Sequence, residues 1–118
     1  MRAYIACDEG GIEELGDVGK DQVLILIDKA EASLSSAKQF GVGFCRSEKD
    51  FLEVRPVGKS QYMLWSDLII KAQSKGLGSF FSRRKTHIDT IVNGREAAAD
   101  VVDNYMNFSR EEFERKYS

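Results

Sequence analysis

The sequence predicts one α+β domain, in which an antiparallel sheet of about four to five strands is packed by two to four helices. Its 118 residues suit a single domain, which buries roughly two-thirds of its unfolded surface. The middle of the chain holds short aromatic and β-branched runs separated by polar turns, which is typical of antiparallel strands. Segments with apolar residues at helical spacing lie before and after it. The 42% hydrophobic and 31% charged content indicates a folded rather than a disordered chain.

The first elements are a strand and a helix. Residues 2–7 alternate loosely enough to form a strand, and the two glycines after them supply a turn. Residues 21–34 carry apolar side chains at helical spacing, with Asp21 as the N-cap. The run VLILI at 23–27 also fits a buried strand, but the spacing favours the helix.

The centre of the chain is predicted to be a meander of three strands at 40–45, 51–57 and 61–65. The polar separators at 46–50 and 58–60 are short, as hairpins require. Pro56 has no N–H to donate to a ladder, so it is placed near a strand end or on an edge strand.

The C-terminal part begins with a short helix at 67–75, although a strand continuing through 68–70 is an alternative. Residues 86–92 then form a strand, and Asn93 with Glu96 caps a helix that runs to about Met106. Its apolar face, which should pack on the sheet, is made of Ala97, Ala98, Val101, Val102, Tyr105 and Met106.

The clearest local signal is FSREEF at 108–113. Ser109 and Glu112 form a capping box, and Phe108 and Phe113 have the spacing of a hydrophobic staple. A short terminal helix is therefore expected to begin here.

Charge is segregated along the chain although the net charge is only −2. Residues 1–34 and 96–118 are acidic, whereas residues 46–95 are basic. Such segregation can steer a charged partner, while the near-neutral total argues against a dedicated nucleic-acid binder. The most concentrated acids, in a glycine-containing segment where a loop could present them together, are Asp8, Glu9, Glu13, Glu14 and Asp17.

Catalytic and metal-binding chemistry is weakly represented. His87 is the single histidine, and we interpret it as a partly exposed or hydrogen-bonded structural residue on a strand. Cys7 and Cys45 do not define a disulfide framework and are interpreted as reduced, buried thiols. A nucleophilic pair of Cys45 with His87 has no support in the spacing. Adjacent carboxylates such as Glu13 and Glu14 point apart on a helix, so neither a metal site nor a cofactor is predicted.

Two further groups have competing interpretations. The basic run at 83–85 follows two phenylalanines, a composition seen in single-strand nucleic-acid grooves, but a charged edge strand explains it better. Tyr62 and Trp65 are either binding anchors or core residues of a strand. The first residues lack a signal peptide and no segment has the length of a membrane span, so the chain is expected to be cytoplasmic.

The layout of the chain resembles bacterial immunity proteins of contact-dependent growth inhibition and polymorphic toxin systems. The segments that carry the resemblance are VLILIDKA at 23–30, FLEVR at 51–55 followed by YMLW at 62–65, and residues 88–105 with REA at 95–97. Together they span most of the chain.

The resemblance implies a non-enzymatic antidote that binds the C-terminal domain of one cognate toxin, frequently a nuclease, and blocks its active site or substrate surface. A nuclease presents basic surface, so an acidic counter-surface would speed association. The first candidate for it is Asp8, Glu9, Glu13, Glu14 and Asp17, and the second is Glu111, Glu112 and Glu114. The alternatives are a small nucleic-acid-binding regulator using Arg83, Arg84, Lys85 and Arg95, or a ligand-binding protein or enzyme with Cys45, Tyr62 or His87 in a pocket between helix and sheet.

Overall fold

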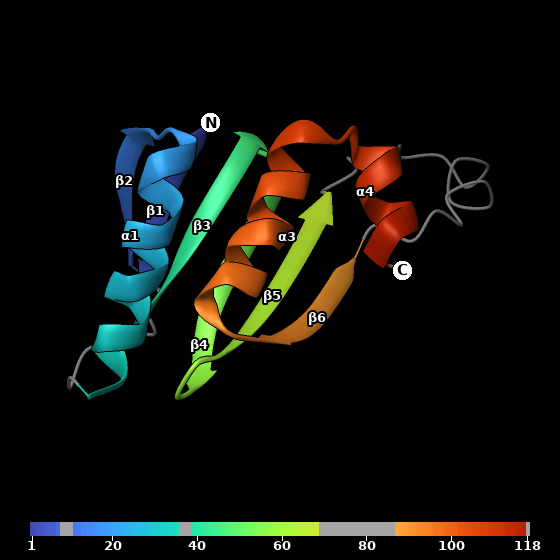
Figure 1. Ribbon diagram of the computed structural model, residues 1–118. Coiled ribbons are helices and arrows are strands. Elements are labelled where there is room, and N and C mark those ends of the chain that lie inside the picture. The colour runs from blue at the N-terminus through green and yellow to red at the C-terminus, as the bar shows by residue number, and fades with distance from the viewer. Residues whose placement is uncertain (8–10, 36–38, 69–86, 118) are drawn as a thin grey trace, which may run out of the picture.

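A six-stranded antiparallel sheet in the order β2-β1-β3-β4-β5-β6 forms one layer of the molecule (Figure 1). The computed structural model describes residues 1–7, 11–35, 39–68 and 87–117. The α+β class is confirmed, with one strand more than the four to five expected. The strands are β1 Arg2–Cys7, β2 Ile12–Asp17, β3 Phe40–Ser47, β4 Asp50–Gly58, β5 Gln61–Leu68 and β6 Ile88–Asn93, and the helices are α1 Lys20–Ala32, α3 Arg95–Asn107 and α4 Arg110–Tyr117, with a 3₁₀ turn at Ser33–Ser35.

The N-terminal part contains one element that was not predicted. Strand β1 is confirmed, but the acidic segment expected to be a loop is strand β2, which pairs with β1 at the edge of the sheet. Helix α1 is confirmed over the strand alternative. Its N-cap is Gly19, whose N–H bonds to the side chain of Gln22 at 3.0 Å, so the predicted cap at Asp21 is wrong. Asp21 lies instead in the first helical turn, where its charge favours the helix dipole.

The meander β3-β4-β5 is confirmed, and its turns are shorter than the polar separators. Pro56 pairs with Tyr62 near the end of β4, an interior strand, so the strand-end alternative is the correct one. Strand β5 continues to Leu68, so a helix starting at Asp67 is wrong. The remainder of that predicted helix, residues 69–75, lies outside the described residues.

Strand β6 and the helix after it are confirmed, but the junction between them differs. Asn93 pairs with Gln61 as the last residue of β6, so it does not cap the helix. Gly94 makes the turn with φ +95°, a conformation that favours glycine. Helix α4 starts as predicted, because Glu112 N donates to Ser109 Oγ and Ser109 N to Glu112 Oε1, both at 3.2 Å. Phe113 is buried and Phe108 packs against the same core.

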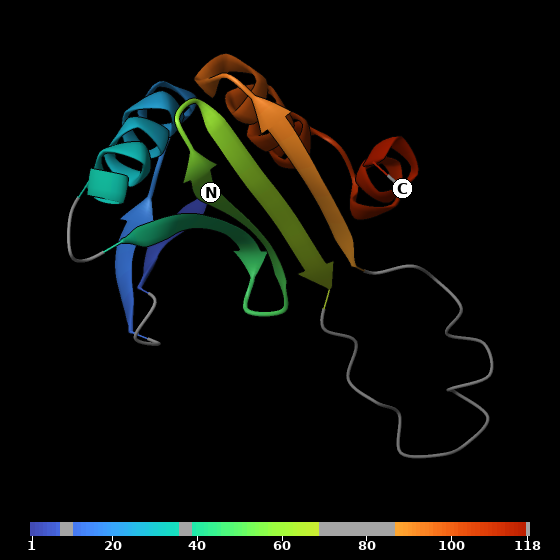
Figure 2. The same cartoon turned by 90° about the horizontal axis from the view of Figure 1, so that it is seen from below.

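One face of the sheet is covered by helices (Figures 1 and 2). Helix α1 contacts β3 and β4, and α3 contacts α1, β5 and β6. The predicted apolar face of α3 is confirmed for Ala98, Val101, Val102 and Tyr105, which are buried in the core, and for Met106, which packs against it. Ala97 does not belong to the core. Among the described residues no helix covers the opposite face of the sheet, which we call the open face.

Candidate binding surface

Three residues of the first predicted binding set, Glu13, Glu14 and Asp17, lie on edge strand β2, and they do not share one face. Glu13 pairs with Ile5, whereas Glu14 pairs with Tyr4, so the two carboxylates project from opposite sides of the strand. Asp17 pairs with Arg2 on the same side as Glu14. Asp8 and Glu9 lie outside the described residues. Acidic side chains on an edge strand also discourage pairing with a second copy of the chain, which gives these residues a structural role as well.

The second set lies on α4 and is divided among three environments. Glu111 is exposed and 4.0 Å from Arg115. The pKa of Glu112 is lowered by its capping hydrogen bonds with the backbone and side chain of Ser109. Glu114 is buried against Arg110, with 3.0 Å between Oε1 and Nε. Glu114 therefore anchors the helix rather than contributing to an exposed surface.

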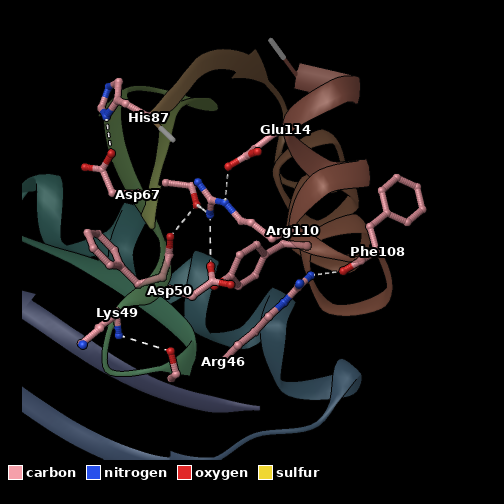
Figure 3. Close-up of polar contacts among 12 residues, drawn as sticks. Arg46, Lys49, Asp50, Asp67, His87, Phe108, Arg110 and Glu114 are labelled. Carbon is pink, nitrogen blue, oxygen red and sulfur yellow. Dashed lines mark hydrogen bonds and ion pairs between the residues drawn. The ribbon is translucent and has the colours of Figure 1, made fainter. Parts of the chain in front are cut away.

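Arg110 is the centre of a buried polar cluster that holds α4 to the sheet (Figure 3). Its Nη1 donates to Asp50 Oδ1 at 3.1 Å and to Ser66 Oγ at 2.5 Å. Tyr105 donates to the same Asp50 oxygen at 2.7 Å, and burial followed by this bond raises the pKa of Tyr105. No buried side-chain polar atom in the described part of the chain lacks a hydrogen-bond partner. We therefore assign this cluster to stability, since buried charges require such compensation.

His87 lies just before β6 rather than within a strand, with a side chain 52% exposed. Its Nδ1 is 2.9 Å from Asp67 Oδ1 and its Nε2 is 3.3 Å from Asp89 Oδ2. This agrees with the partly exposed, hydrogen-bonded role expected for it.

The two thiols do not combine with His87. Cys45 on β3 pairs with Phe51 on β4, and Phe51 pairs with Asp67 on β5. His87, just before β6, contacts Asp67. Three strand spacings, about 14 Å, therefore separate Cys45 from His87. Burial raises the pKa of the Cys45 thiol more than nearby Arg2 lowers it, which disfavours the nucleophilic thiolate. Cys7 is exposed and Cys45 is only partly buried, so the expectation of two buried thiols is wrong.

The pocket proposed between helix and sheet is also not assembled from the predicted residues. Tyr62 faces the core, and its hydroxyl donates to Glu31 Oε2. Cys45 and His87 instead belong to the open face and its rim. Within the described segments, no three His, Cys, Asp or Glu side chains are grouped so that they could hold a metal ion.

The open face carries a row of half-buried aromatic residues from three strands, Tyr4, Phe51 and Trp65. The rings of Phe51 and Trp65 meet edge to face, 5.1 Å apart. Trp65 therefore belongs to this half-buried row, whereas Tyr62 belongs to the core. Side chains three positions apart in a strand point to opposite faces of the sheet, so the sequence alone places Tyr62 and Trp65 on opposite faces. Which of the two faces the core follows only from the face that the helices cover.

Tyr4 lies across strand β3, above Gly43. A Cβ atom at Gly43 would fall 2.0 Å from Tyr4 Cζ, so the absence of a side chain there makes room for the ring. Tyr4 OH donates to Glu53 Oε1 at 2.8 Å. Burial, followed by this bond, raises the pKa of Tyr4.

Beside Tyr4 the open face is hollowed by a pocket of about 330 Å³. Tyr4 and Phe51 are its aromatic walls, and Cys45 and Ile12 add apolar surface. Its ionisable lining residues are mostly acidic: Glu14, Glu48 and Glu53 are carboxylates, and Arg2 is a base. We call this the acidic hollow.

A second groove of about 370 Å³ lies on the other side of the molecule, between α1 and α3. Glu96, Asp100 and Asp103 line one wall, and Lys20 is 3.1 Å from Asp103. The apolar part of the lining is Val23, Leu24, Ala99 and Met106. The groove has no aromatic lining, in contrast to the acidic hollow.

Comparison of the chain with protein-family models, curated proteins and solved structures found no match. None of the described helices is long and apolar enough to cross a membrane.

Proposed function

We propose that this protein is an immunity protein, which binds the toxic domain of a cognate bacterial toxin in the cytoplasm and blocks the active site or substrate surface of that domain. The observation that carries the proposal is the open face, where half-exposed aromatic side chains lie among carboxylates. Aromatic residues supply much of the binding energy of protein interfaces. The buried side-chain polar atoms of the described residues all have hydrogen-bond partners, so the partly exposed aromatic rings of this face are the feature best suited to a protein partner.

The charge of the open face favours a basic partner, and a toxic nuclease is the class proposed. By strand pairing, the acids on this face are Glu14, Asp17, Glu53, Asp67 and Asp89, and the bases are Arg2 and Arg55. A nuclease must attract phosphates and so carries positive surface. Opposite charges across an interface raise the association rate and exclude wrong partners.

The alternative of a nucleic-acid-binding regulator is less well supported by the described residues. Carboxylates on the open face repel phosphates. Arg95, one of the four bases proposed for that role, is engaged by both oxygens of Asp28 at 2.8 and 2.7 Å. The other three, Arg83, Arg84 and Lys85, lie outside the described residues.

The test is co-expression with the C-terminal domain encoded by the upstream neighbouring reading frame. Growth rescue is measured with the active domain, and complex formation is measured by pull-down with a catalytically inactive variant of it. The matched control is the toxic domain of an unrelated system. Rescue restricted to the neighbour, with a one-to-one complex, supports the proposal. The proposal would be overturned if the neighbouring domain is toxic and this protein neither restores growth nor binds the inactive variant of the domain. Steeply salt-dependent binding to RNA or DNA would favour the alternative.

A further inference from the structure

We propose that the acidic hollow is the anchor site of the interface and receives an arginine side chain of the partner. The identity of the partner as a toxin domain rests on the proposed function. The preference of the hollow for a guanidinium group does not, because it follows from the lining of the hollow alone.

The charge of the lining calls for a cation. Among the described residues that line the hollow, three are carboxylates, Glu14, Glu48 and Glu53, and one is a cation, Arg2. Arg2 is itself paired with Glu14, with Nη2 and Oε1 2.8 Å apart. The carboxylates of Glu48 and Glu53 therefore remain in addition to this pair. A ligand with one positive charge would reduce the excess negative charge of the hollow, and its own charge would be paired.

The walls select a guanidinium group over an ammonium group. Tyr4 and Phe51 are half-buried and present aromatic surface to the hollow. A guanidinium is planar, stacks on aromatic rings and forms paired hydrogen bonds with a carboxylate, whereas an ammonium is compact and more strongly hydrated. A lining that combines carboxylates with aromatic rings thus matches arginine in both charge and shape.

The site is organised before any ligand arrives. The ring of Tyr4 occupies the space that a side chain at position 43 would take, and its hydroxyl holds Glu53 at 2.8 Å. The carboxylate of Glu53 is therefore restrained at the edge of the hollow. Binding then costs less side-chain ordering than it would at an unrestrained glutamate.

The first test needs no toxin. Amide chemical shifts of the full chain are followed by NMR during titration with N-acetyl-arginine amide, and with its neutral isostere N-acetyl-citrulline amide. We expect saturable, millimolar shifts at Tyr4, Cys45, Phe51 and Glu53 with the arginine probe and none with the citrulline probe. Equal responses to both probes, shifts centred on the groove between α1 and α3, or no shifts would overturn the inference.

Substitutions distinguish this site from general electrostatic attraction. Glu53→Gln removes a charge but keeps an acceptor for Tyr4, so the fold is retained. We expect it to weaken arginine binding severalfold. Glu96→Gln makes the same change in the groove between α1 and α3 and should leave binding unchanged. Equal losses in both variants would show that only overall charge matters, which contradicts a specific site.

The complex with the cognate toxin separates the two proposals. If the wild-type protein binds no toxin, the proposed function fails, whatever the arginine probe shows. If the wild-type protein binds but Glu53→Gln and Phe51→Ala bind as tightly as it does, the hollow is not the anchor. We expect each variant to lose at least about tenfold in affinity, as central interface residues do, while Glu96→Gln loses none.

Discussion

The guanidinium of Arg110 lies 3.1 Å from the carboxylate of Asp50, although 60 positions separate the two residues in the chain. Both are buried, and Arg110 also donates hydrogen bonds to Glu114 and Ser66 (Figure 3). Removing one partner of a buried ion pair leaves the other charge uncompensated. We expect Arg110→Ala to lower the free energy of unfolding by about 3–5 kcal/mol, as measured by urea denaturation. Arg115→Ala, which removes an exposed pair on the same helix, should cost less than about 1 kcal/mol. Similar costs for the two variants would contradict the anchoring role.

Gly43 is predicted to be intolerant of any side chain because of Tyr4. Gly43→Ala should displace the ring and destabilise the fold by about 1–3 kcal/mol, as overpacking does. In a Tyr4→Ala background the same substitution should be neutral or stabilising, because the ring that supplies the three atoms nearest to the added Cβ is then absent. A double-mutant cycle by chemical denaturation measures this coupling. Additive effects would mean that Tyr4 does not depend on Gly43.

Glu13 and Glu14 form a natural matched pair, since they are adjacent, chemically identical and on opposite sides of β2. If the open face binds a basic toxin domain, Glu14→Lys should slow association, with the effect shrinking as salt rises. Glu13→Lys should slow it less. Stopped-flow association rates with the cognate domain provide the comparison. A larger effect of Glu13→Lys would place the interface on the other side of the strand.

Ser109 caps α4 through the bond to Glu112 N. Ser109→Ala should cost about 1 kcal/mol of stability, and Ser109→Thr, which keeps the hydroxyl, should cost much less. Thermal or urea unfolding at neutral pH measures both. Equal stability of the alanine and serine proteins would show that the cap is not formed in solution.

Glu31 should contribute to the pH dependence of stability. The hydroxyl of Tyr62 and then the N–H of Ser60 hold the pKa of Glu31 below its ordinary value. Because the folded pKa is depressed, the contribution is complete above the unfolded pKa of glutamate and is lost as the pH falls through the folded value. In Tyr62→Phe, the pKa of Glu31 should move up towards its ordinary value when its carboxyl carbon is titrated by NMR. An unchanged titration would exclude the tyrosine as the cause.

Local patterns predicted most of the elements because those elements are specified locally. The meander follows from strands bounded by polar turns, α3 from its apolar face, and α4 from the Ser109 capping box. Strand β2 was missed because only Leu15 turns towards the core there, and the exposed acids around it hide the alternation of an edge strand.

The acidic hollow could not be predicted because it depends on strand pairing. Tyr4, Gly43 and Glu53 meet across three strands, and no local spacing links them. Of its residues, Glu14 was predicted to bind a toxin, and Cys45 was named for the alternative of a ligand pocket. A signal was nevertheless present in FGVGFC at 40–45, since glycines at alternate positions of a strand suggest that a neighbouring side chain lies across it.

The pairing of β1 with β3 joins two parts of the sheet that are each built from neighbours in sequence, the hairpin β1-β2 and the strands β3 to β6. The acidic hollow draws residues from both sides of this junction, so it exists only in molecules where the junction has closed. A partner that occupies the hollow binds the native state and not the unfolded chain. By mass action, free partner at a thousand times its dissociation constant would add about 4 kcal/mol to the stability of the native state. The protein in its complex would then resist unfolding and proteolysis better than the free protein.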